Sequence, residues 1–490
     1  MTRSDAATHV DDRARIAGVM LGCIALTSLG GLVLGASERW GPFALIVAPA
    51  LAACLVLVVG QVRRFAVNVF LLTFAASVIW YVGPLVLGAL PGSPLTLPED
   101  LRQTSRSLAV VSISLAPLVA AYWVFPRPVF RVDWDAIVER GGLLTGVLIA
   151  FALLQTVLIW SGAWTYGAGR EGGLVKSVLS VTTVASLFAG VGSAALAGFY
   201  ARRGGLFDAL SLTMLVATVI SLLWALIAGR RPLALATVLA MAAFFAVFWS
   251  GQSMRTRTLQ GAAATVLALI VIAAGWQTFF AIRLATYAIQ QGAGMPNVVE
   301  LVRRSQALDG VLARQGYRQN LSTRPMIIET VNAFERTATG RLNGEAAANA
   351  ILTAVPEALF PGKPAWEARG SDTEALWTRK LGATRSDWSM TLLIEGFSDF
   401  GYAGLLIYLM LVQGLALLLR WAAFGDRTAE AMAALAILTQ TLNVEISLST
   451  YLATGRNVLL LMAGWWLLSR LVGRVWARAP VLPDRAAKAV

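Results

Sequence analysis

Residues 351–365 read ILTAVPEALFPGKPA, and they lie near the end of a long polar stretch that has strongly apolar, membrane-length segments on both sides. Three prolines, Pro356, Pro361 and Pro364, fix three backbone φ angles within this element, so it predicts a rigid loop and not a helix. The free backbone polar groups of such a loop cannot be satisfied in hydrocarbon. The element therefore has to lie outside a bilayer or line a water-filled cavity.

The overall composition indicates a membrane protein. Of the 490 residues, 57% are hydrophobic and only 14% are charged. Soluble domains carry roughly 25% charged residues, so a multi-span membrane protein is expected. The formal charge of +13 does not indicate a nucleic-acid partner, because the basic residues come mostly as short clusters between apolar runs. In such places they contact anionic membrane lipid and set the topology.

Apolar runs of membrane length recur along the chain. A helix needs about 20 apolar residues to cross the hydrocarbon, and these runs predict an all-α, polytopic fold with about 12 transmembrane helices. The predicted spans cover residues 16–34, 43–62, 65–87, 108–124, 143–160, 178–200, 206–228, 232–249, 261–280, 402–419, 429–446 and 458–472.

The basic residues between these spans predict the orientation. Most of them fall on one side of the membrane: Arg63 with Arg64, Arg127 with Arg131, Arg202 with Arg203, Arg255 with Arg257, Arg420 with Arg427, and the tail at 470–488. By the positive-inside rule this side is the cytoplasm, which makes both termini cytoplasmic. Arg230 and Arg231 fall on the other side. Either the seventh and eighth spans are drawn wrongly, or this pair is kept there for a reason other than topology.

This topology divides the chain into four parts. Residues 1–280 carry spans one to nine, 281–390 form a large external loop, 391–476 carry spans ten to twelve, and 477–490 form a cytoplasmic tail. A structureless loop as long as the second part is unusual in a compact protein. The loop also contains helix-compatible runs at residues 325–339 and 344–355. A partly helical cap over the membrane face is therefore expected.

Arginines are the first candidate site residues in this loop. The segment 314–324 reads RQGYRQNLSTR and brings together Arg314, Arg318 and Arg324. Planar guanidinium groups bind phosphate through two parallel hydrogen bonds, and the hydroxyl and amide side chains between them suit sugar hydroxyls. The segment predicts a pyrophosphate or glycan site. The alternative is a solvated helix on the surface, where arginine is common.

A second external segment has similar chemistry. Residues 161–176 read SGAWTYGAGREGGLVK and combine Tyr166, Arg170 and Lys176 with five glycines. Glycines let the backbone approach a ligand closely, and an aromatic ring can stack on a sugar face. The alternative is a flexible connector with incidental charges.

Acidic residues in the apolar C-terminal region are scarce. Glu395 and Asp399 lie four residues apart in LLIEGFSDFGYAG, so on a helix they share one face. Glu445 lies within or at the end of an apolar span, where an ionisable group usually faces a cavity or a partner. The alternatives are helix capping for Glu395 and Asp399, and a carboxylate that reaches the membrane interface for Glu445.

Several chemistries are excluded by missing residues. Cys23 and Cys54 both lie in apolar segments, and His9 is the single histidine, so neither a disulfide framework nor a histidine-based zinc site is expected. The sequence contains no Walker A motif, no GxGxxG after a strand, no DxD cluster and no GxSxG elbow. No metal ion and no other cofactor is predicted.

Two elements resemble motifs of a known family. Residues 354–364, AVPEALFPGKP, are similar to an IPR-x-LWP-x-KP pattern, and residues 395–404, EGFSDFGYAG, are similar to E-x-Y-x-(N/D)-F-G-x-x-G. In this order, beside a large external loop, both patterns are those of the oligosaccharide repeat-unit polymerases of bacterial inner membranes, the Wzy-like O-antigen and exopolysaccharide polymerases. Lys363 and Glu395 fall on motif positions. Glu357 departs from the pattern, because the family often has arginine there.

The resemblance implies a function and a set of roles. The family consists of metal-independent glycosyltransferases that join undecaprenyl-pyrophosphate-linked repeat units outside the inner membrane, while arginines hold the pyrophosphate leaving group. Its expected partners are the lipid-linked glycan, membrane lipid, a flippase and chain-length regulator proteins. The roles expected here are catalytic for Glu395, Arg324 and Arg170, and substrate-binding for Arg314, Arg318, Tyr166, Lys176, Lys363 and Asp399.

Three other functions compete with this expectation. O-antigen ligases share the architecture but resemble a pattern with a histidine in the large loop, and this loop has none. A polysaccharide transporter or flippase would suit twelve spans with intramembrane charge, but it rarely needs so large a cap. A non-catalytic subunit of an assembly machinery is the third alternative.

Overall fold

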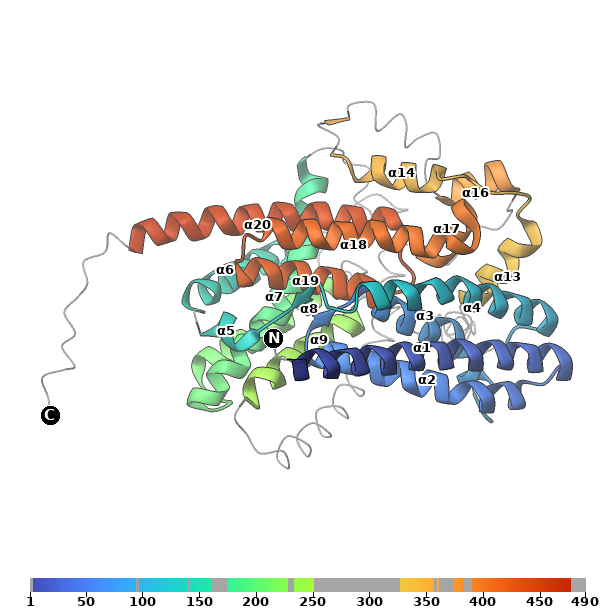
Figure 1. Ribbon diagram of the computed structural model, residues 1–490. Helices are drawn as coiled ribbons and strands as arrows, with labels where there is room; N and C mark the ends of the chain where they lie inside the picture. Colours follow the sequence, from blue (N-terminus) through green and yellow to red (C-terminus); the bar gives the residue numbers. More distant parts are fainter. Residues whose placement is uncertain are drawn as a thin grey trace, which may run out of the picture.

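The computed structural model is mostly helical. It describes residues 3–93, 95, 97–139, 141–160, 174–227, 233–250, 327–356, 359–360, 373–382 and 390–476, with the backbone alone at 3–11, 174–180, 225–227, 233–234, 374 and 473–476. In this part of the chain the helices run side by side in both directions (Figure 1).

The described residues contain seven helices long and apolar enough to cross a membrane: Asp12–Ser37, Trp40–Arg63, Val69–Gly88, Leu101–Val124, Gly142–Trp160, Val181–Gly204 and Leu392–Ala422. Two shorter apolar helices cover Ala209–Trp224 and Leu235–Phe248. Large apolar side chains such as Leu45, which is 80% exposed, lie on the outside of this bundle. An apolar outer surface suits lipid and not water. The chain is therefore an all-α polytopic membrane protein, as predicted.

Four helices form the first layer: α1 (Arg3–Ser37), α2 (Trp40–Arg63), α3 (Val69–Gly88) and α4 (Leu101–Val124). These helices differ in how much of their surface is buried inside the bundle. In the most apolar stretch of α3, 83% of the residues are buried, against 22% in α2. Helix α3 is thus a central element of the bundle, and α2 lies at its periphery.

A two-stranded sheet closes one end of the bundle, which we call the strand end. Strand β1 (Ala66–Val67) pairs antiparallel with β2 (Phe130–Arg131) and so joins the chain after α2 to the chain after α4. Helix α5 (Trp134–Val138) follows. Its neighbourhood holds two ion pairs, from Asp135 to Arg202 at 3.3 Å and from Asp133 to Arg427 at 3.8 Å.

These ion pairs show that basic residues from distant parts of the chain lie at one end of the bundle. The residues at this end include Arg63, Arg64, Arg127, Arg131, Arg202, Arg203, Arg420 and Arg427. The predicted clustering of these residues on one side therefore agrees with the helix directions. Arg230, Arg231, Arg255 and Arg257 lie outside the described residues.

A second group of helices comprises α6 (Gly142–Trp160), α7 (Leu174–Gly204), α8 (Ala209–Ile227) and α9 (Leu233–Phe248), with α7 packed along both α8 and α9. The contact between α7 and α9 is close, because a Cβ atom on Gly198 would meet the backbone oxygen of Phe244. Small residues allow such contacts between membrane helices.

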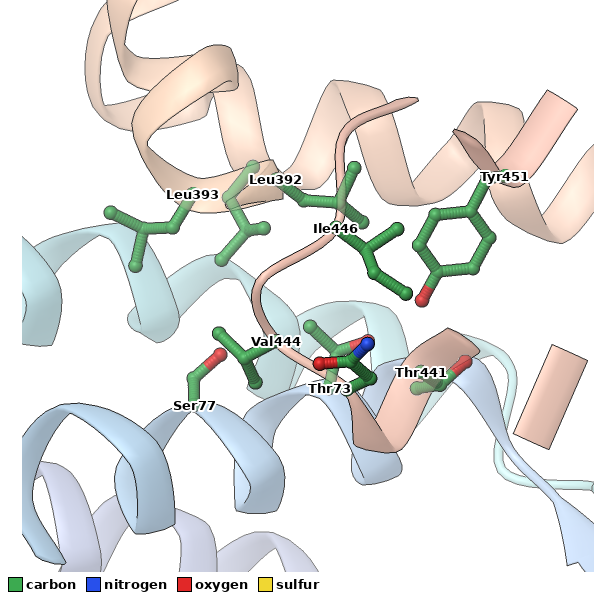
Figure 2. A pocket seen from close by; sticks show the side chains of 10 residues that line it. Thr73, Ser77, Leu392, Leu393, Thr441, Val444, Ile446 and Tyr451 are labelled. Carbon is green, nitrogen blue, oxygen red and sulfur yellow. The ribbon is translucent and has the colours of Figure 1, made fainter. Parts of the chain in front are cut away.

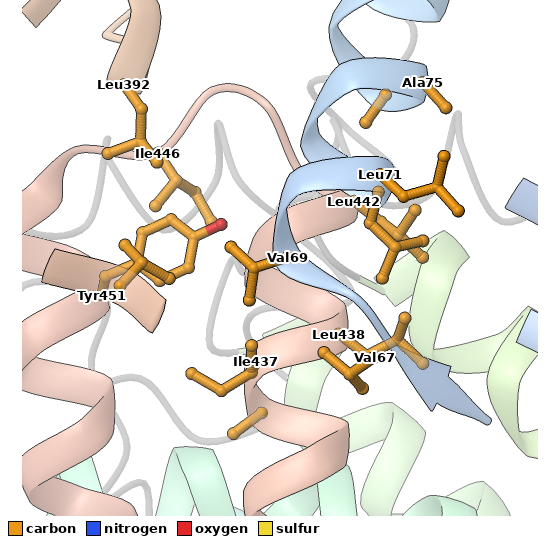
Figure 3. Close-up of a cluster of buried hydrophobic side chains, with 14 of the residues drawn as sticks. Val67, Val69, Leu71, Ala75, Leu392, Ile437, Leu438, Leu442, Ile446 and Tyr451 are labelled. Carbon is orange, nitrogen blue, oxygen red and sulfur yellow. The ribbon is translucent and has the colours of Figure 1, made fainter. Parts of the chain in front are cut away.

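The C-terminal helices are α17 (Leu392–Phe400), the 3₁₀ turn η2 (Gly401–Ala403), α18 (Gly404–Ala422), α19 (Arg427–Leu442) and α20 (Leu448–Trp476). Apolar side chains from α3, α17, α19 and α20 meet in one buried cluster (Figure 3). Its members include Val69, Leu392, Leu438 and Tyr451. This cluster joins the first layer to the C-terminal helices.

Several predicted span limits are wrong. The span drawn at 429–446 ends early, because the chain leaves the helix after Leu442 and stays non-helical until α20 begins at Leu448. Glu445 consequently lies in this break and not inside a helix. The span drawn from residue 108 begins at Leu101, since Asp100 caps the helix by accepting a hydrogen bond from the Gln103 amide at 2.9 Å. The ninth predicted span, 261–280, lies outside the described residues.

Three short helices lie at the opposite end of α4 from the sheet, which we call the cap end: α13 (Ile327–Thr337), α14 (Glu345–Ala354) and α16 (Thr373–Leu381) (Figure 1). The first two confirm the helices predicted at 325–339 and 344–355. Helix α13 packs on α4, where Asn332 donates to the Thr104 hydroxyl at 3.2 Å.

Glu335 makes the second polar contact between α13 and α4. One of its carboxylate oxygens accepts hydrogen bonds from Gln103 and Ser107, both at 3.0 Å. Burial raises the pKa of Glu335, while the bond from Ser107 and the charge of Arg106 act in the opposite direction. The contact therefore holds α13 at the cap end with a carboxyl group that is easier to protonate than usual.

We predict that Glu335→Gln removes a pH-dependent loss of stability. Folding raises the pKa of Glu335, so the protonated carboxyl contributes stability at pH values below its ordinary pKa range. The wild type loses this contribution as pH rises through the raised pKa and the group ionises. A glutamine still offers an oxygen to Gln103 and Ser107 but does not ionise. The melting temperature of the variant in detergent should therefore rise relative to that of the wild type as pH increases above the ordinary pKa range of a carboxyl. A difference that stays constant as pH increases would contradict the argument.

Candidate functional site

Helix α17 is the centre of the candidate site. Its N-cap is Thr391, whose hydroxyl oxygen accepts from the Ile394 amide at 3.1 Å and shares a 2.5 Å hydrogen bond with the hydroxyl of Tyr81 on α3. The helix ends at Gly401, where φ is +67°, a value that glycine adopts without strain. The residues from Leu392 to Asp399 are all buried, although two of them are acids.

Two glycines fold α17 back onto α18. A Cβ atom on Gly396 would come within 2.5 Å of the carbonyl carbon of Gly404, and a Cβ on Gly404 would overlap the backbone of Gly396. Residues eight positions apart in one straight helix would lie about 12 Å apart along its axis. The apolar stretch Leu392–Ala422, counted above as one candidate span, is therefore bent at the cap end, and within it α18, with 19 residues, is the part of membrane-crossing length.

Glu395 binds the start of α20. Its side chain is 2% exposed, and one carboxylate oxygen accepts a hydrogen bond from the Leu448 amide at 2.8 Å. The other oxygen accepts from the hydroxyl of Thr373, the first residue of α16, at 3.0 Å. A carboxylate at a helix N-terminus satisfies a free amide and interacts favourably with the helix dipole. Glu395 thus joins α17, α16 and α20.

Asp399 does the same for α14. Its side chain is 1% exposed, and its two oxygens accept from the amides of Ala346 at 3.2 Å and Ala347 at 2.9 Å. The hydroxyl of Tyr408 on α18 donates a third hydrogen bond at 2.7 Å. The glycine at the N-cap of α14, Gly344, has no side chain to cap its helix. Asp399 supplies this cap from another part of the chain.

The other contacts of α14 complete its attachment. Lys380 on α16 forms an ion pair with Glu345 in the first turn. At the other end, the guanidinium of Arg456 on α20 donates to the carbonyl of Ala354 at 3.1 Å. A negative group at the N-terminus and a positive group at the C-terminus both favour the helix dipole. Ala354 is also the first residue of the AVPEALFPGKP element, so these contacts fix the point at which that element begins.

Arg341 holds the end of α17. Its guanidinium donates to the carbonyl oxygen of Phe397 at 2.8 Å and lies over the Phe397 ring, 4.1 Å from the ring centroid. A cation at a helix C-terminus binds the carbonyls that lack partners there. The two ends of α17 are therefore fixed by Tyr81 through Thr391 and by Arg341.

A small pocket lies beside α17, between α3 and the break that separates α19 from α20 (Figure 2). Its lining is mixed. The apolar part comes from two leucines of α17, from α18 and from the break, and the polar part consists of Thr73, Ser77, Thr441, Asn443 and Tyr451. The hydroxyl oxygen of Thr73 is buried and has no hydrogen-bond partner among the described residues. Such a lining suits a water molecule or another small neutral group.

The arrangement indicates what these groups can do chemically. Both acids of α17 already accept hydrogen bonds on both oxygens, so they act first as fixed anchors for helix N-termini. One of the helices they fix, α14, ends at the first residue of the AVPEALFPGKP element, and both acids themselves lie in the EGFSDFGYAG element. Among the described residues there is no group of three His, Cys, Asp or Glu side chains that could hold a metal ion.

The nine predicted site residues divide into three sets. The structure brings Glu395 and Asp399 together on one face of α17, as their spacing predicts. The backbone of Lys176 lies in α7, but its side chain is not described. Six others lie outside the described residues: Tyr166, Arg170, Arg314, Arg318, Arg324 and Lys363.

Sequence reasoning missed Arg341, Thr373, Tyr408 and Arg456. Arg341, Thr373 and Arg456 bind residues 56, 22 and 102 positions away, and Tyr408 binds Asp399 across the turn between α17 and α18, so no helical spacing reveals these contacts. For Arg456 a signal existed, because this arginine stands close to the long apolar stretch of α20, and ionisable residues near or within membrane segments are usually functional or paired.

Comparisons with protein-family models, with curated proteins and with solved structures found no match to this chain. The family resemblance of the two C-terminal elements therefore stays a prediction.

We predict that the fold tolerates Glu395→Gln and not Glu395→Leu. The amide of glutamine can accept from the Leu448 amide and donate to the Thr373 hydroxyl, so both contacts persist. Leucine leaves both groups buried without partners, at roughly 1–3 kcal/mol for each. Abundance in the membrane and melting temperature should be near wild type for Gln and clearly lower for Leu. Equal losses in both variants would show that the carboxylate charge itself is required.

We also predict that Gly404→Ala destabilises the protein, whereas Gly414→Ala on the same helix does not. An added methyl at Gly404 overlaps the backbone of Gly396, while nothing lies within 4 Å of a methyl at Gly414. Alanine is otherwise the better helix former, by roughly 1 kcal/mol. Melting temperatures should fall for the first variant and stay level or rise for the second. An unchanged value for Gly404→Ala would mean that α17 and α18 do not pack closely.

Proposed function

We propose that this protein is an inner-membrane glycosyltransferase that polymerises undecaprenyl-pyrophosphate-linked oligosaccharide repeat units into O-antigen or exopolysaccharide. One observation carries the proposal. The two elements that resemble the polymerase motifs lie apart in the sequence, and Asp399 of the second caps the helix that leads into the first. A shared site would need such a connection.

The proposed reaction transfers the growing chain from its carrier to a new unit. A hydroxyl of the incoming unit attacks the anomeric carbon of the growing chain, the bond from that carbon to the pyrophosphate oxygen breaks, and the pyrophosphate takes the electron pair. The hydroxyl proton passes to a base or to water. Cationic groups that stabilise the leaving charge lower the barrier most, and the sequence offers Arg170 and Arg324 for this role.

The contacts of Glu395 support a positioning role within this function. Its two oxygens hold α16 and α20 and are buried, so the substrate would have to displace a protein contact to reach them. Asp399 likewise holds α14. The direct catalytic role expected for Glu395 stays a prediction, and a well-expressed Glu395→Gln variant with full activity would exclude it.

The proposed topology follows from the ends of the bundle. The strand end, with its basic residues, is assigned to the cytoplasm by the positive-inside rule, and the cap end to the periplasm. Twelve spans then place both termini in the cytoplasm and residues 281–390 outside. This is the side on which carrier-linked units would be joined.

The decisive experiment uses purified protein in liposomes with lipid-linked repeat units as the one glycan substrate. We expect a ladder of polymer on the carrier lipid. Transfer of a preformed chain to another acceptor without a ladder would instead indicate a ligase. Movement of intact units across the bilayer without any new bond would indicate a transporter.

The arginine variants test the leaving-group role. We predict that Arg170→Ala and Arg324→Ala each slow polymerisation by roughly 30- to 900-fold, which corresponds to about 2–4 kcal/mol of lost charge stabilisation. Lysine should restore little, because it cannot form the two parallel bonds of a guanidinium. Arg420→Ala, at the strand end, is the matched control and should polymerise normally. Normal ladders from both test variants would place these arginines outside the site.

A further inference from the structure

Arg456 lies in the half of α20 nearer the cap end, and its hydrogen-bond acceptors are unusual for a cation. Its guanidinium donates from Nε and one terminal nitrogen to the side-chain oxygen of Asn457, both at 3.2 Å, and from the other terminal nitrogen to the carbonyl of Ala354 at 3.1 Å. All of these acceptors are neutral. Among the residues that the structure describes, Arg456 forms no ion pair.

The guanidinium has donors to spare. An arginine side chain carries five N–H groups, and the bonds above use three of them. Each terminal nitrogen therefore keeps one N–H group without an acceptor in the described structure. A half-buried cation with a neutral surrounding and two free donors is suited to an oxyanion, and phosphate binds such a fork well.

The surface beside Arg456 is apolar. Leu460, Leu467 and Leu471 are 53%, 55% and 51% exposed, and their spacing places them on the same side of α20 as Arg456. The next described arginine on this helix, Arg470, lies about 21 Å further along. Arg456 lies eight residues, about 12 Å, from the start of α20 at the cap end, and the leucine stripe continues from it toward the other end of the helix.

We infer that Arg456 and this leucine stripe form a binding site for the carrier lipid itself, with the pyrophosphate on Arg456 and the isoprenoid chain along α20. The inference rests on the proposed function and adds a place for its carrier. Charge complementarity and the apolar stripe select an amphiphile with an anionic head. The bond from Arg456 to Ala354 then links the bound head directly to the start of the AVPEALFPGKP element.

The capping contact of Arg456 has to be separated from the binding role. If Arg456 only caps α14, its loss should lower stability and leave lipid affinity unchanged. Arg456→Gln removes the charge, and Arg456→Lys keeps the charge and a donor for the Ala354 carbonyl but loses the fork. Arg470→Gln is the matched control, because it removes one arginine from the same helix, where the guanidinium lies over the Trp466 ring at 3.9 Å.

The test measures binding of undecaprenyl pyrophosphate to the purified full-length protein by native mass spectrometry, with undecaprenol and phosphatidylglycerol as comparison lipids. We expect Arg456→Gln to weaken undecaprenyl pyrophosphate binding by at least about tenfold and Arg456→Lys to weaken it less. Undecaprenol binding and the Arg470→Gln variant should not change. Wild-type affinity in Arg456→Gln overturns the inference, as does an equal Arg456-dependent loss with phosphatidylglycerol. If Arg456→Gln does not fold, wild-type affinity in Arg456→Lys also overturns it.

The same preparations separate this inference from the proposed function. Arg456-dependent binding of the carrier by a wild-type protein that makes no polymer would leave the carrier site standing and remove the polymerase. Polymerisation by the wild type together with unchanged carrier affinity in Arg456→Gln would leave the polymerase standing and remove the carrier site.

Discussion

The cap end of this protein depends on two carboxylates of one short helix. Glu395 and Asp399 lie one turn apart on α17, and each binds the N-terminus of a different helix, α20 and α14. Free amides at a helix start need acceptors, and in a membrane protein water cannot always supply them. Placing both acids on one buried helix solves this need for two helices at once. The position of α14 and α20 therefore follows from the position of α17.

The position of α17 depends in turn on close backbone packing. Gly396 and Gly404 bring α17 against α18 with no room for a side chain, and Tyr81 and Arg341 hold its two ends. Each of these contacts is short-ranged and has a fixed geometry. Because buried charges are costly unless fully paired, a displacement of α17 would leave both acids and two helix N-termini without partners. The hydrogen bonds of the acids and the glycine contact thus support one another.

Sequence patterns predicted part of this arrangement for clear physical reasons. The length of the apolar runs predicted membrane helices, and the spacing of four residues correctly predicted that Glu395 and Asp399 share one face. The same patterns misjudged the region around Glu445, because Val444 and Ile446 continue an apolar run while the backbone has left the helix and bends. The helices that the two acids cap could not be predicted, since Leu448 and Ala346 lie about fifty positions away in the sequence. Hydropathy contains no information on such pairings.

The two acids of α17 cap helices other than the one that the sequence favours. Their position predicts capping at the outer entry of the tenth span, whereas the structure shows that they cap α14 and α20. An acid that is fully hydrogen-bonded holds its surroundings rigid, and rigid surroundings are what a loop with three prolines needs at its point of attachment. Groups that meet a charged substrate must instead keep free donors. Arg456 combines both properties, because it binds the end of α14 and retains two N–H groups. The carrier site that we propose at Arg456 would thus be joined directly to the rigid frame.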